Sequence, residues 1–318
     1  MKKEIINFLK NSEGYLSGED ISRELDISRS AIWKYMQELR RDGYEIVAVP
    51  HLGYQLKSSP DKLLAHEIQF GLKTKYLGKR IFHHETLGST MDVAFRLGVE
   101  GEKEGILVCA EGQSKGKGRL GRNWSSPKGK GIYASILLRP QVSPLQVSQL
   151  TLLSAVAVCE GLRRATDISV TIKWPNDILY EGKKVAGILT ELSAEMDRVR
   201  FVVVRIGINV NTPHSLLPQG AISLKQIAHK IFNRVYLLQE ILLRLEYWYE
   251  SYQEQGFERI ISQWKEYSSM LGKRVRINDQ NGVIEGEAID LDKSGGLIIQ
   301  AERGKTIKHM SGDVVPIV

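Results

Sequence analysis

The sequence predicts a multi-domain protein: a winged helix-turn-helix over 1–60, a central α+β domain with a mixed β-sheet over 61–270, and a small SH3-like β-barrel over 271–318. Two observations carry this prediction. Apolar periodicity changes from helical to alternating within the first 60 residues, and it then mixes strands with helices as far as about Val210. The C-terminal residues read only as short alternating strands separated by turns. A chain of 318 residues has room for two or three domains.

Composition excludes several classes of protein. The chain is 42% hydrophobic and 25% charged, with 44 Lys and Arg against 37 Asp and Glu, so wholesale disorder is excluded. Its two cysteines, Cys109 and Cys159, cannot form a disulfide framework or a cysteine-rich zinc site. No apolar run approaches the roughly 18 residues of a membrane helix, and no signal-peptide core is present. We therefore expect a cytoplasmic protein with no membrane partner and no metal site of its own.

The first 60 residues predict three helices and a two-stranded wing. Ser17 and Ser28 are placed to cap the second and third helices, and Gly43 to end the third. The expected strands are 44–49 and 53–56. Apolar side chains recur at core spacing in each helix: Ile5, Ile6 and Leu9; Ile21 and Leu25; Ile32, Met36 and Leu39.

Two short helices joined by a tight turn resemble the winged helix-turn-helix of bacterial repressors, which offers its second helix to operator DNA. The residues expected to face DNA are Ser28, Arg29, Ser30, Trp33 and Lys34. A small helical protein-interaction domain is the alternative. Residues 1–60 are electrically neutral, with nine basic and nine acidic side chains, which argues against tight DNA binding by a monomer. DNA binding would therefore require a dimer on a two-fold site.

The central domain is expected to alternate strands with helices, and a helical pair follows it. Strands are predicted at 81–86, 105–110, 132–138, 169–173, 185–191 and 201–209, and helices at 90–97, 145–166, 235–255 and 257–270. The barrel strands are predicted at 274–277, 283–291, 297–301 and 306–310, with turns such as 279–282. The Trp/Tyr stripe at 247–252 is interpreted as packing, and His83 and His84 as non-ligands, because adjacent strand residues face opposite ways.

A basic, glycine-rich run spans Gln113–Lys130. It contains six Lys and Arg residues and no acidic residue. Backbone N–H groups and cations of such a loop can approach phosphate oxygens, whereas a solvated charged loop is the simpler alternative. Three further polar runs accompany it: Gly88-Ser89-Thr90, Lys173-Trp-Pro-Asn-Asp177 and Lys183-Lys-Val-Ala-Gly187. Together they suit an activated phosphate ester, although Ser89 could be only a helix cap.

These runs, in this order, resemble those of the biotin protein ligases, and with the N-terminal domain the chain resembles the bifunctional class that also represses biotin genes. The resemblance implies that biotin and ATP, with Mg²⁺, form biotinyl-5′-AMP, and that biotin then passes to a lysine of a biotin carboxyl carrier protein. It also implies a homodimer on adenylate binding that recognises operator DNA.

The resemblance assigns a role to each matching residue. Lys184 and Arg119 are implied to be catalytic. Biotin contacts are implied for Ser89, Thr90, Gln113, Gly116, Lys117, Gly118, Arg119 and Lys184. ATP or adenylate contacts are implied for Arg122, Trp124, Lys173, Asn176, Asp177 and Asn209, although Asp177 could be only a cap.

The sequence departs from the family pattern at two positions. Lys117 replaces the first arginine of the usual Gly-Arg-Gly-Arg loop and loses the planar fork. Arg205 replaces a glycine on a strand beside the biotin pocket, so its guanidinium must enter the pocket, find a carboxylate or displace the backbone. We expect it to weaken biotin affinity or slow the first step, which a titration of Arg205→Gly would test.

Two other functions remain open from sequence. Arg205 favours a catalytically impaired biotin-sensing transcription factor, against which Arg119, Lys184 and Asp177 speak. A ligase for another acyl acid, such as lipoate, is the third hypothesis.

Overall fold

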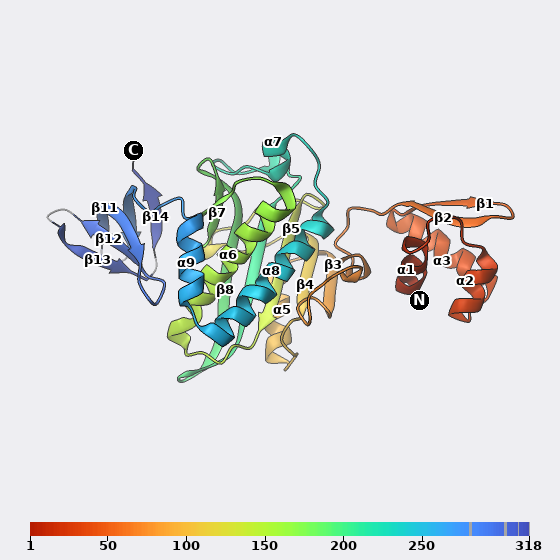
Figure 1. Cartoon of the computed structure of the whole chain (residues 1–318), viewed down its shortest axis with the longest axis horizontal. Helices are drawn as coiled ribbons and strands as arrows, with labels where there is room; N and C mark the ends of the chain where they lie inside the picture. Colours follow the sequence, from red (N-terminus) through yellow and green to blue (C-terminus); the bar gives the residue numbers. More distant parts are fainter. Residues whose placement is uncertain (280–281, 302–303, 311, 318) are drawn as a thin grey trace. The chain divides into compact units, whose positions relative to one another are not determined.

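The computed structural model describes residues 1–279, 282–301, 304–310 and 312–317, which form two compact units, Met1–Lys62 and Leu63–Val318 (Figure 1). The predicted C-terminal domain is thus grouped with the central one, and the first unit ends two residues beyond the predicted boundary.

The first unit is the expected winged helix-turn-helix. Its elements are α1 (Lys2–Lys10), α2 (Gly18–Leu25), α3 (Arg29–Asp42), β1 (Glu45–Val49) and β2 (Gly53–Ser58). The Ser17 hydroxyl accepts a hydrogen bond from the backbone N–H of Asp20 at 3.0 Å, and that of Ser28 accepts one from Ala31 at 3.2 Å. Both predicted caps are confirmed, because each serine satisfies an N–H that the first helical turn leaves without a partner. Leu25, expected in the core, is only half-buried.

The second unit is built on a seven-stranded mixed sheet of order β3-β4-β5-β9-β8-β7-β6. Its strands are β3 (Ile81–Leu87), β4 (Leu107–Gln113), β5 (Gly131–Leu138), β6 (Thr171–Lys173), β7 (Asp177–Tyr180), β8 (Lys183–Glu195) and β9 (Arg198–Asn209). β3 and β4 pair in parallel, and the other neighbours are antiparallel. Strand β7 was not predicted, and only its first residue, Asp177, had been singled out, as the end of a polar run.

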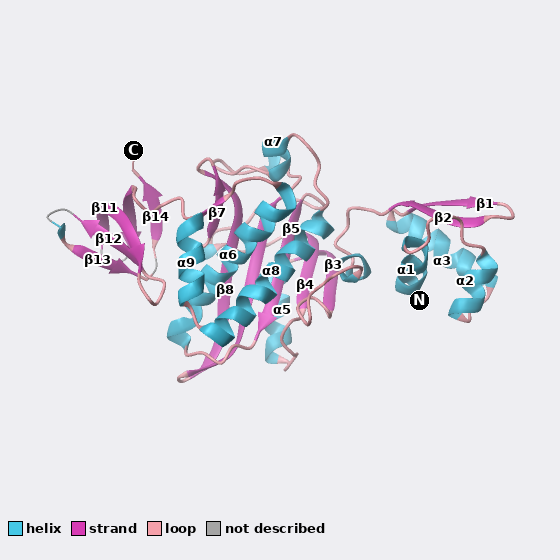
Figure 2. Cartoon of the chain, viewed as in Figure 1, coloured by secondary structure: helices cyan, strands magenta, loops and turns pink. Residues whose placement is uncertain are grey.

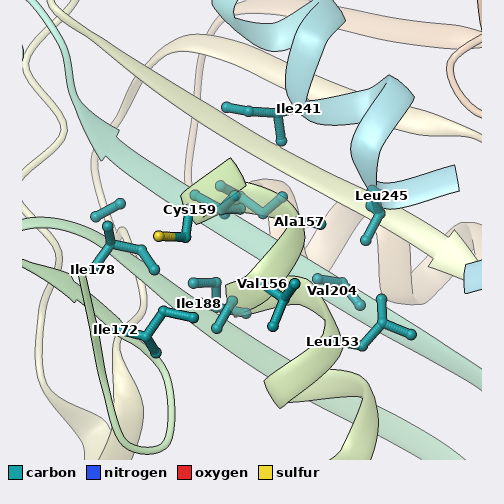
Figure 3. Close-up of a cluster of buried hydrophobic side chains, with 14 of the residues drawn as sticks. Leu153, Val156, Ala157, Cys159, Ile172, Ile178, Ile188, Val204, Ile241 and Leu245 are labelled. Atoms are coloured by element: carbon teal, nitrogen blue, oxygen red, sulfur yellow. The ribbon is translucent and has the colours of Figure 1, made fainter. Parts of the chain in front are cut away.

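Helices cover both faces of this sheet (Figure 2). They are α4 (Ala65–Gln69), α5 (Thr90–Val99), α6 (Val147–Thr166), α7 (Leu224–Ala228), α8 (Arg234–Gln255) and α9 (Glu258–Tyr267), with short 3-10 turns at 119–121, 144–146 and 214–216. Side chains of α6 and α8, such as Val156 and Ile241, pack with Ile188 and Val204 of the sheet on one face (Figure 3). On the opposite face, Met91 of α5 packs in a cluster with Val203. Apolar side chains thus pack on both faces of the sheet.

Helix α6 corrects one expectation from the sequence. The segment Pro144–Thr166 is long and apolar enough to cross a membrane by length and composition, although no such run was expected. Within the structure 72% of its apolar window is buried, so it is a core helix, packed between the sheet and α8.

The C-terminal residues form a five-stranded antiparallel sheet of order β13-β12-β11-β10-β14. Its strands are β10 (Arg274–Asp279), β11 (Gly282–Leu291), β12 (Leu297–Ala301), β13 (Thr306–His309) and β14 (Asp313–Pro316), of which β14 was not predicted. The predicted turn at 279–282 lies partly outside the described residues. The buried Trp174 indole donates a hydrogen bond to the Gly295 carbonyl at 3.0 Å, which ties this sheet to the central one.

A buried ion pair joins the chain's entry into this unit to α8. The Arg234 Nη2 atom lies 2.8 Å from Glu111 Oε2, and both side chains are at most 2% exposed. The other oxygen of Glu111 accepts the backbone N–H of Leu63 at 2.7 Å and lies 3.5 Å from His83 Nε2. Burial raises the pKa of Glu111, but His83, Arg234 and the Leu63 N–H outweigh it and lower the pKa to about 2. The carboxylate is therefore ionised at neutral pH.

We expect Glu111→Gln to lower the free energy of unfolding near neutral pH by about 3 kcal/mol, because it leaves Arg234 buried without its anion. Since folding lowers the Glu111 pKa, the wild-type advantage is complete above the unfolded value of 4.5 and is lost as pH falls toward about 2. Urea denaturation at several pH values measures this. Glu100→Gln, whose side chain is 56% exposed, is the control and should cost less than about 0.5 kcal/mol. A Glu111→Gln deficit that is independent of pH would contradict the assignment.

Candidate active site

A cavity of about 110 Å³ opens on the α5 side of the sheet, between strands β8 and β9, the basic loop and β14. Ordinary small-molecule sites are several times larger. Its lining residues are Gly118, Arg119, Arg122, Asn123, Trp124, Asn176, Asp177, Lys184, Gly187, Ile188, Leu189, Arg205 and Asp313. Four cations from three separate segments, the basic loop, β8 and β9, therefore meet around one cavity, as a site for anionic groups requires.

The cationic end of the cavity is held by short polar contacts. Lys184 Nζ lies 2.6 Å from Asp177 Oδ1, across the β7–β8 pairing. Arg119 Nη1 donates to Asn176 Oδ1 at 2.9 Å, and Asn176 in turn donates to the Ile188 carbonyl at 2.8 Å. Asp177 begins strand β7 and pairs with a lysine, so its cap interpretation is not supported. The predicted pair Lys184 and Arg119 is thus brought together with the predicted nucleotide residues.

A second cluster holds the residues implied to contact the biotin headgroup. Gln113 Oε1 accepts the Thr90 backbone N–H at 2.9 Å and the Thr90 hydroxyl at 3.1 Å. Ser135 of β5 donates to the same hydroxyl at 2.9 Å. Ser89 caps α5 by accepting from the Met91 N–H at 3.3 Å. These side chains are buried against one another and do not line the 110 Å³ cavity.

Trp124 lies over strands β8 and β9, where two glycines make room for it. A Cβ atom at Gly207 would lie 2.7 Å from the Trp124 ring, and one at Gly187 would lie 2.9 Å from it. Lys184 Nζ and Arg205 Cζ lie 5.3 and 5.6 Å from the ring centroid, so both cations contact this indole. Gly187 ends one of the polar runs singled out in the sequence, but the role of both glycines becomes visible only when the loop folds back over the strands.

Two further predicted residues, Asn209 and Arg122, lie at or beside the cavity. Asn209 lines a neighbouring cavity with Trp124, Lys184 and Ala221, and it donates to the Lys184 carbonyl at 3.3 Å. Arg122 pairs with Asp313 of β14, a residue that sequence reasoning missed because β14 was not predicted.

Lys117 and Lys173 are placed less directly. Lys117 Nζ pairs with Asp92 of α5, which raises the pKa of that lysine above its usual value, and its side chain does not line the cavity. Gly116 lies under Trp124, because a Cβ there would meet the Trp124 carbonyl at 2.5 Å. Lys173 ends β6 outside the cavity.

Arg205 takes one of the three courses open to it from sequence. Its side chain is 1% exposed and lines the cavity, and Nη1 donates to the Lys117 carbonyl. Nε and Nη2 are buried without a hydrogen-bond partner among the described residues. Burial lowers the pKa of Arg205 to about 10, so the guanidinium is protonated near neutral pH. The residue has therefore entered the pocket as a cation.

In comparison with known proteins, three family models match the N-terminal, central and C-terminal parts of the chain. Residues 84–211 match the Biotin/lipoate A/B protein ligase family, 2–55 match an HTH domain, and 270–315 match the Biotin protein ligase C terminal domain. The fold and the site thus define a ligase of this class with an N-terminal DNA-binding domain, called the head below.

Relatives and solved structures narrow the class. The bifunctional ligase/repressor BirA of Bacillus subtilis (strain 168) is 42% identical over 96% of this chain and 95% of that protein. The Escherichia coli (strain K12) protein of the same name is 30% identical over 98% and 95%. A biotin protein ligase from Aquifex aeolicus, solved in complex with biotin and ATP, has 31% identity and a TM-score of 0.65, covering 75% of this chain and 99% of that one. The chain belongs to the family of bifunctional ligase/repressor proteins.

The packing of Trp124 on glycine predicts a coupled effect. Gly207→Ala should lower the free energy of unfolding by about 1–2 kcal/mol, because the new methyl group overlaps the indole. In a Trp124→Ala background the same change should cost much less, and a double-mutant cycle in urea measures the difference. Gly88→Ala, where a Cβ meets nothing within 4 Å, is the control. Equal costs in both backgrounds would show that Trp124 does not rest on Gly207.

Proposed function

We propose that the chain is an ATP-dependent biotin protein ligase that also represses biotin genes. In the first step a biotin carboxylate oxygen attacks the α-phosphorus of ATP, and pyrophosphate leaves as biotinyl-5′-AMP forms. In the second, the amine of a carrier-protein lysine attacks the acyl carbon, an amide forms, and AMP leaves. The observation that carries this proposal is the meeting of Lys184, Arg119 and Asp177 in one cavity beside the Thr90–Gln113 cluster.

The cations answer the main physical difficulty of the first step, which is that two anions must meet. Lys184 and Arg119 would neutralise the carboxylate and the α-phosphate and hold them in line, as preorganised charges do in other phosphoryl chemistry. Trp124 and Asn209 flank the neighbouring cavity, where an adenine ring would stack on the indole. The loop 113–130, lying over the strands, would shield the mixed anhydride from water.

Magnesium would enter with ATP. Asp177 offers a carboxylate and Asn176 an amide oxygen at the cavity wall, the oxygen donors that Mg²⁺ accepts alongside phosphate oxygens. No group of three or more His, Cys, Asp or Glu that could hold a metal occurs among the described residues.

Repression would follow from linkage between the ligand and a dimer. An adenylate that orders the 113–130 loop would favour a homodimer, and the dimer would present two copies of α3 to a two-fold operator. Trp33, 60% exposed on α3, together with Arg29, Ser30 and Lys34, would face the DNA. The carrier protein and the dimer partner would compete for one edge of the central sheet. The proposal includes a cytoplasmic location and domain boundaries at 1–60, 61–270 and 271–318.

An impaired biotin sensor is the second candidate, favoured by Arg205 in the cavity. A ligase for lipoate is the third candidate. Melting curves with biotin or with lipoate would separate it from a biotin ligase, because only a bound ligand raises the melting temperature.

Lys184→Met should reduce biotin-dependent exchange of pyrophosphate into ATP by about 100-fold or more, because the cation that faces both anions is lost. The adjacent Lys183, which is exposed, provides the matched control Lys183→Met, with exchange expected near the wild-type rate. Exchange that survives in Lys184→Met would remove this lysine from the first step.

Selection of bound DNA from a random duplex pool tests both activities together. We expect a two-fold site to be recovered with biotin plus Mg-ATP, and not with biotin alone or with no ligand. Recovery without ligand would make the head a constitutive binder. If no condition enriches a site, biotin transfer by Arg205→Gly would distinguish a ligase with an idle head from a chain disabled at Arg205.

A further inference from the structure

Arg205 lies where the two groups of site residues meet. It pairs with Ser135 across β5 and β9, so both side chains leave the same face of the sheet, and Ser135 contacts Thr90 at 2.9 Å. On its other side, the guanidinium contacts the Trp124 ring that Lys184 also contacts. Arg205 therefore lies between the headgroup cluster and the reacting cations, along the path of an extended acid.

The guanidinium has hydrogen-bonding capacity that the described residues leave unused. Nη1 donates to the Lys117 carbonyl, whereas Nε and Nη2 are buried without a partner. No carboxylate forms an ion pair with it within the part of the chain that the structure describes, and Asp177 is engaged by Lys184. The charge of Glu191 attracts the guanidinium without forming an ion pair with it. A buried cation without a paired anion is unfavourable, so a ligand that supplies an anionic acceptor gains more here than a neutral one does.

Lys117, the neighbouring cation of the loop, is not placed to bind a ligand carboxylate in the cavity. Lys117, one residue from Gly118 of the cavity wall, directs its ammonium to Asp92 and stays outside the cavity. Its carbonyl, by contrast, holds Arg205 in place. The strand thus supplies the planar fork that the loop lacks at this position.

We propose that Arg205 is a specificity-determining residue that pairs with the carboxylate of the acid substrate and selects the charged acid over neutral analogues. This inference rests on the proposed ligase function. The side chain has two separable effects: its bulk reduces the space for every ligand, and its charge favours only anionic ones. The expected weakening of biotin by Arg205 concerns the first effect, and the selectivity concerns the second.

The test compares the affinities for biotin and for biotinol, in which a primary alcohol replaces the carboxylate. Isothermal titration on the full chain gives the ratio of the two affinities for wild type, Arg205→Met, Arg205→Lys and Arg205→Gly. We expect the preference for biotin to fall about 10- to 100-fold in Arg205→Met, the usual effect of losing a charged hydrogen bond. Arg205→Lys should keep part of it. Arg205→Gly should bind both ligands more tightly than Arg205→Met while keeping the reduced preference.

Arg200→Met is the matched control, because Arg200 lies on the same strand with its side chain 51% exposed and paired with Glu195 at 3.2 Å. Its preference should equal that of wild type, and melting curves check that each variant is folded. An unchanged preference in Arg205→Met that still binds biotin would overturn this inference alone. Failure of the wild-type chain to bind biotin would overturn the proposed function, and this inference with it.

Discussion

The buried pair of Glu111 and Arg234 fixes the frame on which the site is built. Glu111 lies two residues before Gln113, where the basic loop leaves β4, and Arg234 Nη1 donates to the carbonyl of Gly131, where the loop returns as β5. One ion pair therefore holds both ends of the loop and the start of α8. Because both charges are buried, removing either one leaves the other without its counter-ion. The pair therefore fixes, from below the loop, how the loop spans the sheet.

Within that frame, the site concentrates positive charge where little negative charge balances it. Lys184, Arg119 and Arg205 line one small cavity with Asp177 as the partner of Lys184. The Trp124 ring accepts contact from two of these cations, and two glycines let the ring approach the strands. A ligand with a carboxylate and a phosphate would complete this charge balance, which is the electrostatic reason to expect an acid and a nucleotide in the same site.

Much of the fold could be predicted from local patterns. Ser17, Ser28 and Gly43 marked helix ends, because caps depend on neighbours a few residues away. The long strands were found because they are apolar, with their ends displaced by a few residues. Strand β7 was missed because its four residues begin at the end of a polar run, and strand β14 because 313–316 is short and gains its strand character from pairing with β10, far earlier in the chain.

The sequence by itself determined the chemical identity of the site: the basic loop, the Lys173–Asp177 run, Lys184, and the anomaly at Arg205. Tertiary structure alone decided what Arg205 contacts. The β5–β9 register places it opposite Ser135 and on the loop side, whereas its neighbours Val204 and Ile206 face the α6 core. A shift of one residue would have turned the guanidinium into that core. Register between strands about seventy residues apart is set by packing on both faces of the sheet, which no local pattern contains.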